Sequence, residues 1–464
     1  MEERILTKEA SSFRDPSGFV FYHRNTVFRQ VNISFKDDYN FFKKSNLFKK
    51  LINEGLLIPF KEVPNFKGKN SEIFATLKSE KIPFISYPFE WCFEQLKDAA
   101  LCTLRIQKLC LSYNISLKDA SAYNTQFLKG KPIMIDLLSF ERYHEGSPWI
   151  AYRQFCEHFL GPLLLMSKVD SRLELLLERY LDGIPIDLTS RLLPKSTYLN
   201  LSILAHIHLH ARNQKKYGAN SSIKKQRGKF LTKTMLLGII DNLESLIGNT
   251  RYSGSLSEWG EYSNFMNYSN SAFTNKKKIV KSYLLLKKPK DVWDLGANTG
   301  EFSRIASDLG ILTVSFDYDL DAVNKNYMQV KKNGEKNVLP LLLDLVNPTP
   351  ALGWAHEERK SLLARGPSDL TMALALIHHL SISKNIPFGS IASYFAKICK
   401  SLIIEFVPKE DDKVQLLLQN RKDIFPWYNQ KTFESEFAKY FRIVKRNTIG
   451  GKSLRILYLM EGKR

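Results

Sequence analysis

The chain has 464 residues, 44% of them hydrophobic, which is enough for two or three domains with packed cores. Its formal net charge is +21, but the basic residues occur in short clusters over both halves, so a Lys-rich solvated surface is favoured over a nucleic-acid face. The amino terminus lacks the apolar region of a signal peptide, no stretch is long and apolar enough to span a membrane, and the five cysteines suit neither a zinc site nor a disulfide framework. These features indicate a soluble, cytoplasmic protein without a bound metal.

The first hundred residues alternate strand-like and helical pieces. Residues 18–31 hold two strand-like runs around the turn-like segment His23–Asn25, and residues 38–57 have a helical pattern. A short strand is expected at 84–91, and a long amphipathic helix over 93–113 follows it. The sequence therefore predicts an α+β domain at this end of the chain.

Three polar residues follow the long helix at a characteristic spacing. Asp119 and Asn124 are separated by four residues, and Asp136 ends the next apolar run. This pattern resembles the catalytic loop and metal-binding aspartate of kinase-like phosphotransferases, which implies a kinase-like layout. However, two leucines follow Asp136 where the family has Phe-Gly, and no nucleotide-binding lysine can be assigned. A degenerate kinase-like scaffold and an unrelated domain in which these residues cap backbone amides are equally favoured, and an active kinase is disfavoured.

The next segment, residues 149–210, has a helical pattern. Its closely spaced histidines, His206, His208 and His210, do not suggest a metal site, because a helix turns the middle one away and no acidic partner is near in sequence. Residues rich in Lys, Gln, Asn, Ser and Gly then form the best candidate for a linker. The expected domains are an α+β domain over 1–212, a linker and bridging helix over 213–250, and a second domain over 251–464.

The second domain is organised around a buried strand that runs into a glycine-containing loop and then a helix, over residues 291–304. Gly296 and Gly300 let the backbone turn sharply and let a ligand approach the main chain. Asp294 leads this loop, and a carboxylate there repels a pyrophosphate but attracts a cation or hydrogen-bond donor, such as the ammonium group of an amino acid. The pattern indicates a nucleotide-type ligand that carries an amino-acid tail.

Further apolar runs with polar ends follow in order. Asp317 ends the first, about twenty residues after the loop, and Asp344 ends the second. The remaining runs are expected as strands around 369–375, 401–407, 441–444 and 454–459. The sequence therefore predicts an α/β sheet flanked by helices.

The loop and this series of strands resemble the motifs of class I S-adenosylmethionine-dependent methyltransferases, with Ala297 and Asn298 in place of the middle glycine of the loop. The resemblance implies a Rossmann-like sheet and S-adenosylmethionine as cofactor, with Asp317 at the ribose hydroxyls and Asp344 at the adenine amino group. It implies the following cofactor-binding residues: Asp294, Gly296, Ala297, Asn298, Gly300, Phe302, Asp317, Tyr318, Asp344, Leu345, Leu374 and Ala375. The aromatic residues before the loop, Trp259, Tyr262 and Tyr268, are expected to cover the donor or to pack on the domain.

The resemblance also bears on the reaction. A sulfonium is an activated methyl donor, so a base is needed only for a protonated acceptor, and His378 and His379 are the candidates for that base. Both histidines fit a structural role in a helix start equally well. Glu405 is a further candidate, with a buried strand-end carboxylate as the alternative. The motif of methylation on planar nitrogens is absent, which favours an oxygen or carbon acceptor.

Taken together, the segments around Asp119, Trp149 and His378 resemble a bacterial two-part group that includes a rhizobial nodulation protein. That resemblance implies a small-molecule or surface-glycan acceptor. Two alternatives remain open, a nucleic-acid methyltransferase and a non-catalytic partner protein that binds the donor.

Overall fold

The computed structural model describes residues 7–63, 72–219, 231–254, 270–419, 422–450 and 453–463. The chain forms two compact units. Unit 1 consists of residues 1–254 and 353–359, and unit 2 consists of residues 255–352 and 360–464. The predicted aromatic residues Trp259, Tyr262 and Tyr268 lie outside the described residues, as do residues 220–230 of the expected linker segment.

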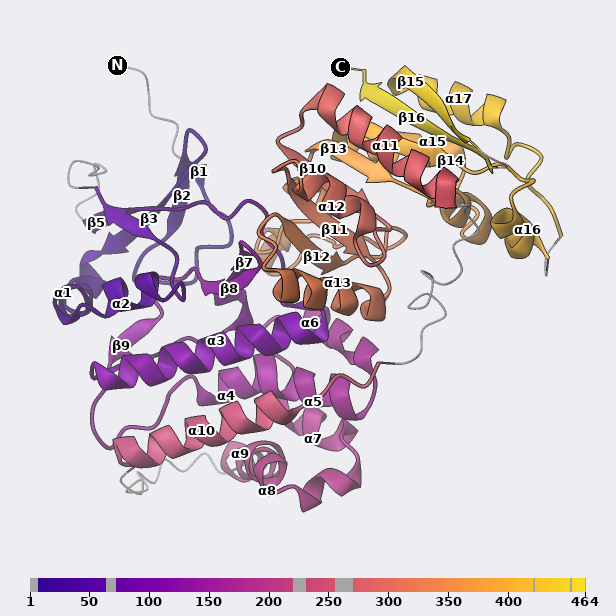
Figure 1. Cartoon of the computed structure of the whole chain (residues 1–464). Coiled ribbons are helices and arrows are strands. Elements are labelled where there is room, and N and C mark those ends of the chain that lie inside the picture. Colours follow the sequence, from indigo (N-terminus) through magenta and orange to yellow (C-terminus); the bar gives the residue numbers. More distant parts are fainter. Residues whose placement is uncertain are drawn as a thin grey trace. The chain divides into compact units, whose positions relative to one another are not determined.

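Unit 1 begins with a five-stranded antiparallel sheet in the order β1-β2-β3-β5-β4 (Figure 1). Its strands are β1 (Thr7–Lys8), β2 (Val20–His23), β3 (Thr26–Asn32), β4 (Phe60–Glu62) and β5 (Ile73–Ser79). Two helices connect β3 to β4, namely α1 (Lys36–Ser45) and α2 (Leu47–Asn53). The single helix expected over 38–57 is thus wrong, because Asn46 takes a left-handed conformation with φ of 61° and ends the first helix.

The rest of unit 1 is mainly helical around α3 (Phe93–Ser112), whose apolar face joins the core under the sheet. The side chain of Gln95 accepts a hydrogen bond from the backbone of Cys92 at 3.1 Å and so caps the start of α3. Residues 84–91 form no strand but a short 3-10 turn at Pro88–Glu90, because proline supplies no backbone donor for a sheet.

Two small antiparallel pairs follow α3. They are β6 (Ile115–Leu117) with β9 (Phe140–Arg142), and β7 (Thr125–Leu128) with β8 (Lys131–Met134). The later helices of unit 1 are α4 (Tyr152–Phe155), α5 (Gly161–Lys168), α6 (Leu176–Arg179), α7 (Ile186–Leu192), α8 (Leu201–Ile203), α9 (His210–Ala219) and α10 (Lys233–Asn249). The bridging helix expected after the linker is α10, which packs on α3 and is joined to it by ion pairs from Lys108 to Asp241 and Glu244, both at 2.7 Å.

Unit 2 is built on a seven-stranded sheet in the order β12-β11-β10-β13-β14-β16-β15 (Figure 1). The strands are β10 (Asp291–Leu295), β11 (Leu312–Asp317), β12 (Val338–Leu342), β13 (Ser368–Ala373), β14 (Cys399–Phe406), β15 (Phe441–Gly450) and β16 (Ser453–Gly462). The strands from β12 to β14 are parallel, and β16 and β15 close the sheet as an antiparallel pair. The predicted α/β sheet, including its closing pair, is confirmed.

Helices cover both faces of this sheet. On one face, α11 (Asn270–Lys287) and α12 (Glu301–Ser307) share a core with Val292 and Ile403. On the other, α15 (Phe388–Ile398) and α17 (Gln430–Ala438) bring Phe388 and Phe433 against Phe406. The remaining helices of unit 2 are α13 (Leu320–Asn333), α14 (Leu362–Arg365) and α16 (Asp412–Leu418). Residues that alternate along one strand therefore enter separate cores, as the period of a strand requires.

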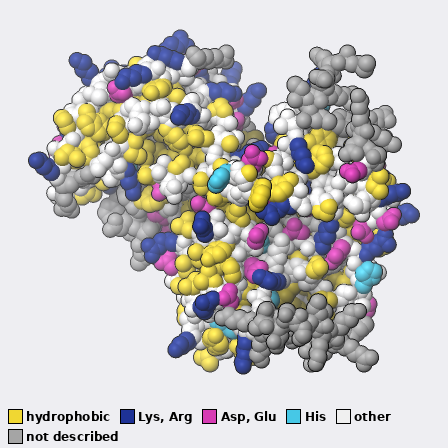
Figure 2. Space-filling view, turned by 180° about the vertical axis from the view of Figure 1, so that it is seen from behind, with side chains coloured by type: hydrophobic (Ala, Val, Ile, Leu, Met, Phe, Trp, Pro, Cys, Tyr) yellow, Lys and Arg dark blue, Asp and Glu magenta, His cyan; other side chains and the backbone are white. Residues whose placement is uncertain are grey.

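The surface, the helices and the cysteines give three further observations. On the face shown in Figure 2, Lys and Arg side chains lie scattered among acidic and apolar ones instead of forming one stripe. Within the described ranges, no helix combines the length and apolarity that crossing a membrane requires. All five cysteines are buried.

Candidate functional site

The loop after β10 adopts the backbone conformations that the sequence predicted. Gly296 and Gly300 have φ of 72° and 81°, which favour glycine. A Cβ at Gly300 would lie 2.6 Å from the side-chain ends of Asn326 and Arg304, so both would have to move, and the positive φ adds backbone strain for any other residue. The amides of Gly296 and Ala297 both donate to the Phe316 carbonyl at 2.9 Å. The loop is therefore fastened to β11, and Gly300 caps the start of α12.

Asp294 lies beneath this loop and not at its surface. Only 2% of it is exposed, and its carboxylate accepts a hydrogen bond from Ser303 of α12 at 2.6 Å. The Ser303 hydroxyl also lies 3.0 Å from that of Ser315 on β11. Burial raises the pKa of Asp294 to about 7, although the Ser303 hydrogen bond opposes this change. Its carboxylate thus joins the strand to the following helix.

Asp317, at the end of β11, supports the same loop. Its carboxylate accepts hydrogen bonds from the amide of Asn298 at 2.7 Å and from the amide of Asp319 at 3.0 Å. Burial raises the pKa of Asp317 to about 6. Its neighbour Tyr318 is 61% exposed, and Asp319 caps the first turn of α13. An acidic group and an exposed ring therefore lie at the end of this strand.

The other predicted residues follow the next two strand ends. Asp344 is exposed after β12 and accepts a hydrogen bond from the amide of Val346 at 2.8 Å, with Leu345 between them. Leu374 is buried after β13, and Ala375 has an unusual φ of 50°. Because β12, β11, β10 and β13 are adjacent and parallel, their carboxyl ends meet along one edge of the sheet.

Phe302 is the remaining member of the predicted set. It lies in the first turn of α12, partly buried, with its ring edge-on to Phe273 and below the ammonium of Lys276 at 4.7 Å. The structure thus gathers the whole predicted cofactor set around the edge formed by four strand ends. Within the described ranges, no cluster of His, Cys, Asp and Glu side chains is arranged to hold a metal.

The two histidines lie beyond the end of β13. Their rings are 4.2 Å apart at 41°, and His378 is fully buried. Neither ring nitrogen of His378 has a hydrogen-bond partner in the described part of the chain. Burial, with further effects from His379 and the cations Arg455, Lys276 and Lys413, lowers the pKa of His378 well below its usual range. Burial likewise lowers the pKa of His379 to about 4, so both rings are neutral near pH 7.

Glu405 is the centre of a buried ion network that the sequence did not reveal. Its carboxylate lies 2.6 Å from the ammonium of Lys276 and 3.5 Å from the guanidinium of Arg455. Arg455 in turn forms a two-pronged ion pair with Asp411 at 2.6 and 2.8 Å. Lys276 belongs to a short basic cluster that suggested only solvated surface. Its spacing of four residues from the buried Val280 is the signal that places it on the inner face of α11.

In unit 1, the three residues with kinase-like spacing are held by the chain itself. Asp119 accepts a hydrogen bond from the amide of Ser121 at 2.9 Å, and Asn124 donates to Ser139 at 3.2 Å. Asp136 is bonded to the hydroxyl of Ser139 and to the amide of Leu138. Asp119 and Asp136 thus accept from nearby backbone amides, as the capping alternative expects, whereas Asn124 bonds a side-chain hydroxyl and caps no amide through this contact.

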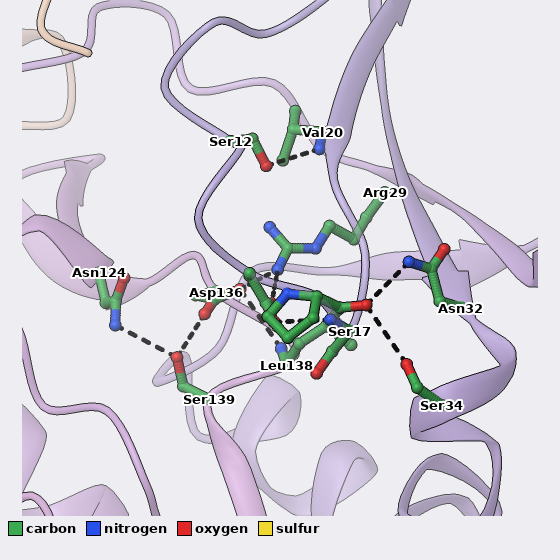
Figure 3. A network of polar contacts seen from close by, with 12 residues as sticks. Ser12, Ser17, Val20, Arg29, Asn32, Ser34, Asn124, Asp136, Leu138 and Ser139 are labelled. Carbon is green, nitrogen blue, oxygen red and sulfur yellow. Dashed lines mark hydrogen bonds and ion pairs between the residues drawn. The ribbon is translucent and has the colours of Figure 1, made fainter. Parts of the chain in front are cut away.

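Asp136 also has a partner that the sequence did not indicate. Arg29 of β3 lies 3.0 Å from Asp136 and 2.9 Å from Asp15. Figure 3 shows the guanidinium of Arg29 directed toward Asp136. Arg29 is almost fully buried, so its cation balances both carboxylates within the unit. The signal that could have found it is a lone arginine within the apolar run Val27–Val31.

The strand order of unit 2 and the loop at its first strand define a class. The strand order is that of the Rossmann-like sheet of class I S-adenosylmethionine-dependent methyltransferases, and the loop has the glycine conformations that the sequence resemblance implies. No protein-family model matches the chain. Over 464 residues it is 34% identical to nodulation protein NoeA of Rhizobium meliloti (strain 1021), with 97% of this chain and 95% of that protein covered. The chain therefore belongs to the NoeA family.

Several solved structures resemble part of the chain. Magnesium protoporphyrin IX methyltransferase from Synechocystis PCC 6803, with bound SAH, matches 45% of this chain and 95% of its own, with 12% identity and a TM-score of 0.33. N-methyltransferase NodS from Bradyrhizobium japonicum WM9 matches 42% and 99%, with 11% identity and a TM-score of 0.30. The bifunctional kinase-methyltransferase WbdD matches 45% and 43%, with 17% identity and a TM-score of 0.29. With TM-scores below 0.5, these likenesses do not by themselves define the fold.

Proposed function

We propose that unit 2 binds S-adenosylmethionine at the carboxyl edge of its parallel strands and transfers the methyl group to an oxygen or carbon acceptor. One observation carries the proposal: the glycine loop, Asp317, Asp344 and Ala375 follow four adjacent strands in one sheet. Ligands of open α/β sheets bind at this edge. An unrelated sheet would not be expected to place all of these residue types there.

Each part of the proposed site has a distinct task. The open backbone around Gly296 and Gly300 receives the amino-acid tail, while Asp317 accepts hydrogen bonds from the ribose hydroxyls and Asp344 from the adenine amino group. Asp294 lies beneath the loop and holds Ser303, and a cationic ligand above it would favour its charged form. The turn at Ala375 borders the methyl donor.

The bound cofactor supplies an activated methyl group on its sulfonium, so the protein's main task is to align the acceptor. His378 and His379 are neutral near pH 7, and a neutral imidazole can accept a proton or a hydrogen bond from the acceptor. Because their pKa values are low, they are weak bases, which suits an acceptor that loses its proton easily.

The acceptor is proposed from the family and the surface. Membership in the NoeA family, whose named member is a nodulation protein, supports a small-molecule or glycan acceptor. The scattered basic side chains on the face in Figure 2 make a nucleic acid the less favoured partner. We place the protein in the cytoplasm, because its five cysteines are buried thiols.

Calorimetry of the full chain with S-adenosylmethionine and S-adenosylhomocysteine tests the donor site. Gly300→Ala should weaken binding at least about tenfold, because its Cβ would displace the side chains of Asn326 and Arg304 beside the loop. Gly310→Ala is the matched control, since Gly310 also has a positive φ but open space around its Cβ. Equal binding by both variants and the wild type would contradict the proposed site. Mass spectrometry of glycans and RNA nucleosides from cells with and without the protein would then identify the acceptor.

A further inference from the structure

Glu405 is fully buried on β14, among parts of unit 2 that are distant in sequence. One of its carboxylate oxygens accepts a hydrogen bond from Lys276 at 2.6 Å and another from the amide of Ala375 at 2.7 Å. Its other oxygen faces Arg455 at 3.5 Å. A carboxylate oxygen that already accepts two hydrogen bonds, one of them from an ammonium, is poorly suited to remove a proton from an acceptor. The contacts of Glu405 are instead those of a residue that holds neighbouring parts of the chain in place.

The group that Glu405 supports is the turn after β13. Ala375 has φ of 50°, a conformation that is uncommon for a residue with a Cβ and costs free energy unless the surroundings hold it. The backbone amide of Ala375 donates a hydrogen bond to the Glu405 carboxylate, and this bond can hold the turn in that conformation. The next residue, Leu376, reaches the donor loop, where its side chain would lie 3.2 Å from a Cβ at Gly296. The turn therefore lies between Glu405 and the loop.

Lys276 links the same carboxylate to the other side of the site. Lys276 is only 2% exposed. Its ammonium lies 4.7 Å from the centre of the ring of Phe302, which follows the loop glycine Gly300 by two residues. Burial lowers the pKa of Lys276, and the charge of Glu405 opposes that change. Removal of Glu405 alone would leave the buried Lys276 ammonium without this counter-charge, whereas removal of both charges would not, because Arg455 keeps its ion pair with Asp411. The charge balance and the support of Ala375 can therefore be separated by mutation.

We propose that Glu405 is a positioning residue for methyl transfer: with its charge balanced by Lys276, it holds the Ala375 amide and so keeps the turn after β13 against the donor loop. The inference rests on the proposed function, because it assigns this turn to the border of the methyl donor. It separates Glu405 from the base role that its sequence position suggested. The ion pair with Lys276 allows the carboxylate to remain buried in that position.

Two double variants of the full chain isolate this role. Lys276→Met with Glu405→Gln removes both charges but keeps an oxygen that can accept from the Ala375 amide. Lys276→Met with Glu405→Leu removes both charges and the acceptor. Binding of S-adenosylhomocysteine by calorimetry, the melting temperature, and hydrogen exchange of a peptide that contains Ala375 are measured for each. Lys287→Met with Glu461→Gln is the control, since that ion pair at 3.0 Å also joins α11 to the sheet, but it does so at the other end of α11 and on β16 instead of β14.

The Gln variant should bind S-adenosylhomocysteine within about threefold of the wild type, and the Leu variant at least about tenfold more weakly, the effect of one lost hydrogen bond. Faster exchange at Ala375 should accompany the loss in the Leu variant, with melting temperatures alike. Equal affinity and equal exchange in the two variants would overturn the proposal. If either double variant fails to fold, Glu405→Asp with Lys276 kept retains both charges but shortens the side chain by one methylene, and its exchange at Ala375 and its affinity are compared with those of the wild type. Absence of binding by the wild type would instead overturn the proposed function. Hydrogen exchange at Ala375 would still test whether Glu405 holds the turn after β13.

Discussion

At the scale of single residues, Asp317 combines a structural contact with a proposed contact to the donor. It fastens the loop through the Asn298 amide and lies at the end of β11, where the proposed donor would present its ribose. Asp319, two residues later, caps α13 through the amides of Asp321 and Ala322 at 2.8 and 3.1 Å. The two carboxylates are close in sequence, yet they are expected to respond differently to mutation.

Asp317→Ala should lower the affinity for S-adenosylhomocysteine at least about tenfold, because a hydrogen bond to a charged acceptor contributes about 1.5–3 kcal/mol. Asp319→Ala should instead lower the melting temperature, since loss of a helix cap costs about 1 kcal/mol, with a smaller effect on affinity. Calorimetry and thermal melts of both variants check this. Equal, small losses of affinity would remove the ribose assignment.

His379 provides a test of pH dependence. Its folded-state pKa is about 4, below the ordinary value of 6.5, because burial and nearby cations disfavour its charged form. The folded protein therefore binds fewer protons than the unfolded chain between these values, so its stability is present above pH 6.5 and is lost as the pH falls toward 4.

His379→Gln should accordingly make the melting temperature less sensitive to pH between 7 and 5, with a gain relative to the wild type at pH 5 of about 1–2 kcal/mol. Thermal melts at both pH values measure it. His144→Gln, at an exposed position, serves as the control. A wild-type slope that persists in the His379 variant would show that this ring is not held neutral by the fold.

At the scale of elements, the sheet of unit 1 supplies Arg29 to the residues that resemble a phosphotransferase loop. The arginine extends from β3 to Asp136 beyond β8 (Figure 3). It also pairs with Asp15 in the connection between β1 and β2. Phosphoryl transfer depends on placing metal and cation charges at the phosphates. Here, the cation nearest the candidate metal ligand is an arginine that already balances two carboxylates.

We therefore expect no ATP hydrolysis or phosphotransfer above background, and at most weak Mg²⁺-dependent ATP binding that requires Asp136. Incubation of the purified chain with labelled ATP and candidate acceptors measures transfer, and equilibrium dialysis measures binding. Asp136→Ala and Asp119→Ala are the informative variants. Transfer that either of them abolishes would contradict the expectation and define a second activity.

At the scale of the whole molecule, the division into units does not follow the chain in one cut. Residues 353–359, between β12 and β13 in sequence, group with unit 1. Within unit 1, Glu358 from this segment pairs with Arg14 at 2.6 Å, and Arg359 lies 3.9 Å above the ring of Tyr123. A protein that lacks residues 1–250 would lose these contacts while keeping every strand of the seven-stranded sheet.

A chain that begins at Arg251 should still fold and bind the donor, because all the predicted cofactor contacts follow that residue. Its melting temperature should rise with S-adenosylhomocysteine according to RT ln(1 + [L]/Kd). Thermal melts at several ligand concentrations check this, with the full chain as reference. A folded fragment that shows no shift at saturating ligand would mean that the donor site needs unit 1.

The sequence by itself determined the succession of strands in unit 2 and the set of residues at their ends, because a buried parallel strand is a local apolar run and a tight loop needs glycine locally. Local rules were weaker where one residue interrupts a pattern, as Asn46 does between α1 and α2. Only the tertiary structure decided the partners of buried charges. Glu405 meets Lys276 across 129 residues, and Arg455 meets Asp411 across 44. The two members of such a pair have no characteristic spacing in the sequence, because only the fold brings their charges together out of water.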